Sequence, residues 1–355
     1  MKQRILGFDL ARAVAIFGMV IVNFKIVMHA RASEDMAWLK IVNIIDGRAS
    51  ALFVILAGVG LSLLTRQSRL SGDLQLLAIE KKSLFKRAGL LFVLGVLYIE
   101  IWPADILHYY GVYILVGALC LLLASRYLFA LIVLLLIVST LLFVMLDYSA
   151  QWNWQTLAYA DLWTTKGFIR NLIFNGFHPV LPWLGFLLLG MLIGRQNLAH
   201  VAVRERLFML GFFAAVLAEL IVLLLPYALL MGMPPAYKIF FSTEPMPPLP
   251  VYFIGAAGSA TVIITLCVAL GEKYAQKAWL MPFVYTGQLA LTFYLAHVML
   301  GMGLLESLGM LENQSLAFSL MCAVLFCVFA VVFASYWRKF YSLGPLEGLL
   351  RRASR

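Results

Sequence analysis

Long apolar segments alternate with short polar ones along the whole chain. Ten segments are mostly apolar over about 17 to 25 positions, the length that a helix needs to cross the hydrocarbon core of a bilayer. Unbroken apolar runs such as 127–146 show no strict alternation, so they predict helices and not the strands of a barrel. The predicted spans are 8–28, 48–65, 85–102, 108–125, 127–146, 179–195, 206–230, 249–270, 279–304 and 314–337. The pattern therefore predicts an all-α integral membrane protein, a bundle of about ten transmembrane helices.

The composition narrows the class of protein further. The 355 residues are 63% hydrophobic and 12% charged, whereas a soluble domain is about half apolar and about one quarter charged. With a mean hydropathy of +0.95, this excludes a soluble globule and a disordered chain, and it argues against nucleic acid as the partner that explains the net charge of +10. The four cysteines all lie in apolar runs, without a CxxC pair, so no disulfide framework is expected.

The distribution of positive charge predicts the orientation in the membrane. Nineteen of the 27 Lys and Arg residues fall in the segments on one side of the ten spans and seven in those on the other side. Because cytoplasmic segments carry the excess of Lys and Arg, both termini are predicted to be cytoplasmic. No connecting segment is long enough to bury a core of its own, so we expect one domain over 1–355. The outer segment 147–178 is rich in Trp and Tyr, which predicts either an interfacial aromatic belt or a surface that stacks on sugars.

Four of the five histidines fall at or near the outer ends of predicted spans. They are His29, His108, His178 and His297. An imidazole is the side chain best suited to acid–base work near neutral pH, and ionisable groups near membrane depth are candidates for function by default. The alternative interpretation is that histidine, like Trp and Tyr, is tolerated at the membrane interface.

Asn23, His29 and Asp46 form the most informative local group. A carboxylate bonded to one imidazole nitrogen raises the basicity of the other, and a carboxamide can orient an acceptor or stabilise an oxyanion. In a regular helix Asn23 and His29 would lie about 120° apart, so the first helix is expected to end or kink between them. The alternative interpretations are structural: a helix-bridging Asn23, an interfacial His29, and an Asp46 that caps the second span.

Other polar or small residues inside the spans have mainly structural interpretations. Asp9 and Arg12 lie three apart on one helix face, which predicts a structural ion pair. Glu219 is a charge inside the seventh predicted span, so we expect it to face the bundle interior, to be protonated or to meet a partner; a proton relay is the alternative. Gly190 and Gly194 predict close helix packing. We find no metal-ligand spacing, and we expect no metal.

Several blocks together resemble the YeiB-like bacterial membrane proteins. The blocks are Phe8–Ile16, Ile45–Gly58, Trp102–Gly111, His178–Trp183, Gly287–Leu295 and Gly344–Glu347. That family belongs to a transmembrane acyltransferase superfamily similar to heparan-α-glucosaminide N-acetyltransferase, which transfers an acetyl group from cytosolic acetyl-CoA to a glucosamine across the membrane. The resemblance implies a multi-pass protein of the bacterial inner membrane, acetyl-CoA as cosubstrate and a sugar or glycan acceptor.

The resemblance also implies site residues. The matching positions are Asn23, His29 and Asp46, with His29 as general base or acyl carrier. The interval from Asn23 to His29 is shorter than in the family and that from His29 to Asp46 is longer, so His108 or His178 is the substitute base if that alignment fails. The superfamily and the Gly190/Gly194 pair also suggest a homodimer.

Two further classes of function are compatible with the sequence. One is a proton-coupled transporter or flippase of a glycan or lipid precursor, in which Glu219 and the histidines relay protons. The other is a binding or scaffold subunit of an envelope complex. Only the acyltransferase interpretation requires a thioester donor, so consumption of acetyl-CoA separates it from both.

Overall fold

The structure is a computed structural model that describes residues 5–28, 42–229 and 235–354. Helices dominate these residues, and the two short strands β1 (Trp152–Asn153) and β2 (Ala158–Tyr159) pair antiparallel in one connecting segment. The chain is therefore an all-α membrane protein, as the apolar pattern predicts.

The helices of the first half of the chain are α1 (Leu6–Val27), α3 (Arg48–Leu64), α4 (Arg66–Ser71), α5 (Leu74–Tyr98), α6 (Leu107–Leu119), α7 (Ser125–Met145), α8 (Thr165–Arg170) and the π-helix η1 (Asn171–Asn175). Those of the second half are α9 (Val180–Arg195), α10 (Val201–Leu229), η2 (Pro235–Phe241), α11 (Pro250–Lys273), η3 (Ala278–Leu280), α12 (Met281–Gln288), α13 (Ala290–Ala296), the π-helix η4 (His297–Met302), α14 (Gly303–Ser307), α15 (Leu316–Trp337) and α16 (Pro345–Ala353).

Six helical segments among the described residues are long and apolar enough to cross a membrane. They are Leu6–Val27, Ser125–Met145, Val201–Leu224, Pro250–Lys273, Ala290–Ser307 and Leu316–Trp337. A seventh crossing results if the pair Thr165–Asn175 and Val180–Arg195, bent by 49°, is one broken span. Two further helices, α3 and α6, are also apolar but are shorter than these segments. The protein is therefore multi-pass.

Each of the ten predicted spans coincides with a helix or with a run of helices. The predicted span 279–304 is broken into a run of short helices from η3 to α14. The predicted span 85–102 covers the second half of the longer helix α5, which ends at Tyr98, and the residues that follow it. Large apolar side chains on α7, such as Leu134, Leu141 and Met145, are exposed on the protein surface. In a membrane protein such side chains contact lipid, because a bilayer core is as apolar as leucine. The count of ten remains a prediction.

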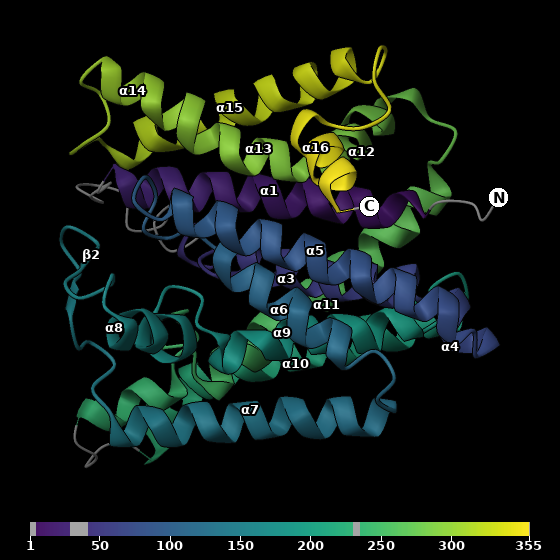
Figure 1. Ribbon diagram of the computed structural model, residues 1–355. Helices are drawn as coiled ribbons and strands as arrows, with labels where there is room; N and C mark the ends of the chain where they lie inside the picture. The colour runs from purple at the N-terminus through teal and green to yellow at the C-terminus, as the bar shows by residue number, and fades with distance from the viewer. Residues whose placement is uncertain (1–4, 29–41, 230–234, 355) are drawn as a thin grey trace. The chain divides into compact units, whose positions relative to one another are not determined.

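The chain divides into two compact units, each of which is described here by itself. The first unit comprises 1–53, 198–212 and 259–349. Its first helix, α1, packs against α12, α13 and α15 (Figure 1). Asp9 of α1 is buried and paired at 2.6 Å with Arg12, as the spacing of three predicts, and Gln288 Nε2 donates to the other Asp9 oxygen at 3.2 Å.

The second unit comprises 54–197, 213–258 and 350–355. Within it α5 packs against α6, and α7 runs along α9 (Figure 1). An aromatic core holds α9 and α11 together: Phe186 stacks on Phe253 with ring centroids 4.3 Å apart, and Trp183 and Tyr252 lie beside them. All four rings are at least 95% buried. This core fixes the start of α9, where His178 precedes the helix.

Two glycines let α3 and α9 approach each other directly. A Cβ at Gly58 would overlap the backbone oxygen of Leu187 and would lie 2.9 Å from Gly190 Cα. A Cβ at Gly194 would lie 2.8 Å from the Ser62 side chain. The close packing predicted from Gly190 and Gly194 is therefore a contact within the chain, and the pair gives no argument for a dimer.

We predict that Gly58→Ala lowers the midpoint of thermal unfolding in detergent by an amount equivalent to about 1–3 kcal/mol. The added methyl group meets backbone atoms of α9, which cannot rotate away as a side chain can. The matched control is Gly89→Ala in α5, where a Cβ meets no atom within 4 Å. This change should leave the midpoint unchanged or raise it, because alanine is a better helix former than glycine. Equal midpoints for the two variants would contradict the α3–α9 contact.

Candidate functional site

Asn23 of α1 contacts His297, which begins η4 in the same unit. Asn23 Nδ2 lies 2.9 Å from His297 Nε2, and His297 Nδ1 lies 3.3 Å from the backbone oxygen of Phe293. A carbonyl only accepts, so Nδ1 carries the proton and Nε2 accepts from the Asn23 amide. Both imidazole nitrogens of the fully buried His297 are thus occupied. These contacts orient the Asn23 amide, and a role of His297 in acid–base work stays a prediction.

The end of α1 carries a second polar contact. Lys25 Nζ donates to Asp46 at 2.5 Å and to Asn43 at 3.0 Å, which ties the end of α1 to the start of the following helix. The helix ends at Val27, so the prediction that it ends or kinks between Asn23 and His29 is confirmed. His29 itself lies outside the described residues. Asp46 therefore has Lys25 as a partner, and its predicted pairing with His29 remains a prediction.

A carboxylate–imidazole pair lies at the start of α6 in the second unit. Asp105 Oδ2 is 2.9 Å from His108 Nδ1, and the two side chains are 0% and 1% exposed. The same oxygen accepts from the backbone N–H groups of Leu107 at 2.9 Å and His108 at 3.2 Å. Three donors thus hold one carboxylate oxygen. Because the carboxylate accepts from Nδ1–H, Nε2 is left as the basic nitrogen, which is the arrangement of a general base.

Close packing of α5 holds this pair in place. A Cβ at Gly95 would overlap His108 N and lie 2.8 Å from Asp105 Oδ2, so only glycine fits there. On the other side the His108 ring packs on Tyr109 with centroids 3.8 Å apart. The Tyr109 hydroxyl donates to Asn171 Oδ1 at 2.6 Å. The imidazole is therefore fixed by backbone, ring and hydrogen-bond contacts together.

His178 belongs to the same polar region of the second unit. Its ring lies 6.2 Å from that of Tyr109 and against the backbone of Asp105. Its backbone oxygen accepts from the Tyr113 hydroxyl. The structure thus brings together two of the predicted histidines, His108 and His178, through residues of α6.

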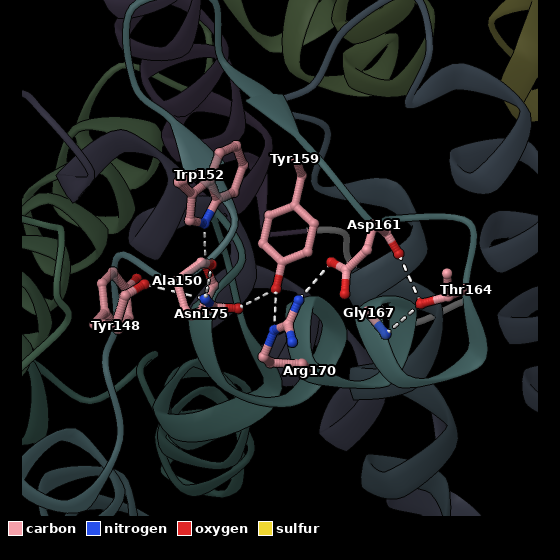
Figure 2. A network of polar contacts seen from close by, with 9 residues as sticks. All are labelled: Tyr148, Ala150, Trp152, Tyr159, Asp161, Thr164, Gly167, Arg170 and Asn175. Carbon is pink, nitrogen blue, oxygen red and sulfur yellow. Dashed lines mark hydrogen bonds and ion pairs between the residues drawn. The ribbon is translucent and has the colours of Figure 1, made fainter.

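A polar network folds the connecting segment 147–178, which leads to His178, as Figure 2 shows. Asn175, fully buried, donates through Nδ2 to the backbone oxygens of Tyr148 and Ala150, each at 3.0 Å, and accepts from the Tyr159 hydroxyl at 2.8 Å. Trp152 Nε1 donates to the backbone oxygen of Asn175 at 2.6 Å. Since the bend that carries His178 follows directly, this network fixes where α9 begins.

Arg170 completes the network from α8. Its guanidinium donates to the Tyr159 hydroxyl at 2.6 Å and pairs with Asp161 at 2.5 Å (Figure 2). Burial raises the pKa of Tyr159, an effect that the hydrogen bonds with Arg170 and Asn175 oppose. The phenol therefore stays protonated at neutral pH, donating to Asn175 while it accepts from Arg170.

The expectation that Glu219 faces the bundle interior is wrong, whereas the expectations that it is protonated or meets a partner stay predictions. The side chain lies exposed on α10 and does not point into the interior of the chain. The preceding Ala218 is the buried position of that turn. The apolar run of α10 is hydrophobic on all sides, so its periodicity could not show which side faces inward.

The sequence analysis assigned no site role to two charged residues of these clusters, Lys25 and Asp105. Both entered it only through the charge of the segments between the predicted spans. Asp105 and His108 are three apart at a predicted helix start, the same spacing that identifies Asp9 and Arg12, so this signal was available. No local signal links Lys25 to Asp46, 21 positions away. Among the residues that the structure describes, no group of three or more His, Cys, Asp or Glu side chains is placed to hold a metal ion.

Comparison with known families gives two matches. A family model described as heparan-alpha-glucosaminide N-acetyltransferase, catalytic, matches residues 4–225. A second model, described as a protein of unknown function (DUF418), matches residues 193–355. No curated protein matches the chain significantly. The first match covers more than half of the chain and contains both Asn23 and the Asp105–His108 pair.

We predict that Asn175→Asp destabilises the connecting segment 148–177. A carboxylate at this position would face two backbone oxygens and leave them unpaired, at a cost of at least about 1–3 kcal/mol. The measurement is proteolysis of the purified protein in vesicles, together with its unfolding midpoint; cleavage in this segment should rise. Asn153→Asp is the matched control, because exposed Asn153 uses only Oδ1, accepting from the backbone N–H groups of Gln155 and Thr156. Identical cleavage of both variants would show that the network does not hold the segment.

Proposed function

Because the chain belongs to the heparan-alpha-glucosaminide N-acetyltransferase catalytic family, we propose that it is a transmembrane acyltransferase. It moves an acetyl group from cytosolic acetyl-CoA to an amine or hydroxyl of a sugar or glycan on the extracytoplasmic side. The observation that carries this proposal is the family match over 4–225. The DUF418 match over 193–355 agrees with the YeiB-like assignment of the rest of the chain.

The proposed setting is the bacterial inner membrane. In this proposal ten segments cross the bilayer, both termini are cytoplasmic, and 1–355 acts as one catalytic domain. The excess of Lys and Arg in the segments assigned to the cytoplasm supports this orientation and suits the phosphates of CoA. A homodimer remains a prediction from the superfamily.

We assign the base to His108. The support is its pairing with Asp105 at 2.9 Å, which fixes the tautomer with Nε2 unprotonated. In the proposed step the acceptor nitrogen or oxygen attacks the thioester carbonyl while Nε2 removes its proton. The C–S bond then breaks, and the imidazolium returns the proton to the CoA thiolate. A route through an acetyl-imidazole on the same nitrogen is the two-step variant.

The first-span group is the alternative location of the base. There His29, oriented by Asp46, removes the proton, and Asn23 holds the acceptor or the oxyanion. The contact between Asn23 and His297 supports a fixed carboxamide with a second Nδ2 hydrogen left to donate. The bond between Asp46 and Lys25 weakens this alternative, because it gives the carboxylate a different partner.

The position of Glu219 weakens the transporter interpretation. That interpretation uses Glu219, together with the histidines, as a buried proton relay, and the Glu219 side chain is exposed on α10. We therefore develop the acyltransferase proposal alone.

We predict that acetyl-CoA raises the unfolding midpoint of the detergent-purified protein in a saturable way. Binding at 100 times the dissociation constant adds about 2.7 kcal/mol of stability. The measurement is thermal unfolding with acetyl-CoA, CoA and dephospho-CoA at matched ionic strength. Absence of any shift at millimolar acetyl-CoA would contradict the proposed donor.

We predict that His108→Ala lowers the rate of acetyl transfer to glucosamine at least about 100-fold, because general-base catalysis contributes about 10²–10⁴. Asp105→Asn should lower it similarly and alter its pH dependence, since an amide stabilises the imidazolium less than a carboxylate does. The matched control is His200→Ala, at an exposed histidine outside both clusters.

The same assay on His29→Ala tests the alternative location. Full activity in this variant with loss in His108→Ala supports the assignment to His108. Loss in His29→Ala with full activity in His108→Ala would move the base to the first span.

A further inference from the structure

Two buried polar atoms at the start of α9 lack hydrogen-bond partners within the described residues. They are His178 Nδ1 and Trp183 Nε1, and both atoms are buried. Trp183 is 0% exposed, and the two rings meet edge to face with centroids 4.5 Å apart. A buried polar group without a partner costs about 1–3 kcal/mol. Two such groups in contacting rings indicate a place where a ligand supplies the missing bonds.

The chemistry of the two atoms restricts the ligand. An indole N–H only donates, so the ligand must present an acceptor to Trp183. The His178 ring also forms a hydrogen bond with the backbone of Asp105. Because a carbonyl only accepts and Nδ1 has no partner among the described residues, this bond places the ring proton on Nε2 and leaves Nδ1 as an acceptor. A hydroxyl group both accepts and donates, so it can accept from Trp183 Nε1 and donate to His178 Nδ1. A carboxylate, which only accepts, would require a proton on Nδ1.

One ring connects His178 to the proposed base. Tyr109 contacts both imidazoles, with its ring centroid 3.8 Å from that of His108 and 6.2 Å from that of His178. Around Trp183 the rings of Phe186 and Tyr252 form an aromatic wall. Aromatic faces beside a few polar atoms are typical of sites that bind small ligands with hydroxyl groups.

We propose that His178 and Trp183 form a hydroxyl-binding subsite for the acceptor sugar, next to His108. Trp183 Nε1 donates to a ligand hydroxyl, and His178 Nδ1 forms the second bond to the ligand. The identification of the ligand as the acceptor rests on the proposed function. Binding of a hydroxylated ligand at the subsite does not depend on the proposed function, and a separate experiment measures it.

Fluorine NMR of protein labelled with 5-fluorotryptophan measures that occupancy directly. Comparison of labelled wild type with labelled Trp183→Phe assigns one resonance to Trp183 by its disappearance. If Trp183→Phe does not fold, His178→Gln assigns the same resonance by its displacement. Titration of wild type with glucosamine should move this resonance in a saturable way and leave that of exposed Trp279 in place. An unmoved Trp183 resonance would mean that the two atoms bind water only, and the proposal would be overturned.

Kinetics then connect the subsite to transfer. Trp183→Phe should raise the KM for glucosamine about tenfold, the effect of one lost hydrogen bond, with no change in the KM for acetyl-CoA. The matched control is Trp337→Phe, which removes an indole N–H that already donates to the backbone oxygen of Leu343 at 2.9 Å. The control should leave both KM values unchanged. Equal changes in the two variants would show a general packing effect and overturn the subsite.

The two proposals can fail independently. If acetyl-CoA neither stabilises the protein nor acetylates glucosamine while the Trp183 resonance still moves, the subsite stands and the acyltransferase proposal falls. If acetyl-CoA binds and transfer proceeds while the resonance stays in place, the acyltransferase proposal stands and the subsite falls.

Discussion

A carboxylate enclosed by apolar helices must be held by donors from its own chain, because lipid offers none and water is excluded. Asp105 meets this constraint through one oxygen, which accepts from the His108 ring and from two backbone N–H groups. These bonds fix the turn that begins α6, and Gly95 lets α5 lie directly against that turn. The position of the His108 imidazole therefore follows from the need of the buried Asp105 carboxylate for hydrogen-bond donors.

The same constraint organises the other polar groups of each unit. In the first unit, the buried His297 uses both nitrogens and so fixes the Asn23 amide. In the segment of the second unit that connects α7 to α9, Asn175 pairs with two backbone oxygens and with Tyr159 (Figure 2). Each network is nearly complete in itself, which makes its residues rigid. His178 Nδ1 and Trp183 Nε1 are among the buried atoms without a partner within the described residues, and the contact between their rings supports the proposed ligand site.

These networks support the proposal that the apolar bundle contains a site for acyl transfer. A reaction of this kind needs a base with a fixed tautomer, a positioned acceptor and little water. The second unit supplies a carboxylate-paired imidazole beside a second imidazole and an aromatic wall. The proposal for this arrangement rests on the family match over 4–225, because the geometry alone also fits a structural helix cap at Asp105.

The sequence by itself determined the class of the protein, the approximate position of its helices and the family. Hydropathy is a local property of each segment, so the ten predicted spans coincide with helices, and the motif blocks identified the YeiB-like and heparan-α-glucosaminide N-acetyltransferase families. Helix geometry over six positions was sufficient to predict that α1 ends between Asn23 and His29.

Only the tertiary structure decided which polar groups meet. Asn23 and His297 are 274 positions apart, and their contact depends on how α1 packs against the helices that follow α12. Glu219 turned out to lie on the exposed side of α10, since a helix that is apolar on all sides carries no signal for its inward face. The packing of whole helices determines which polar side chains form hydrogen bonds with each other, and no single segment of the sequence contains that information.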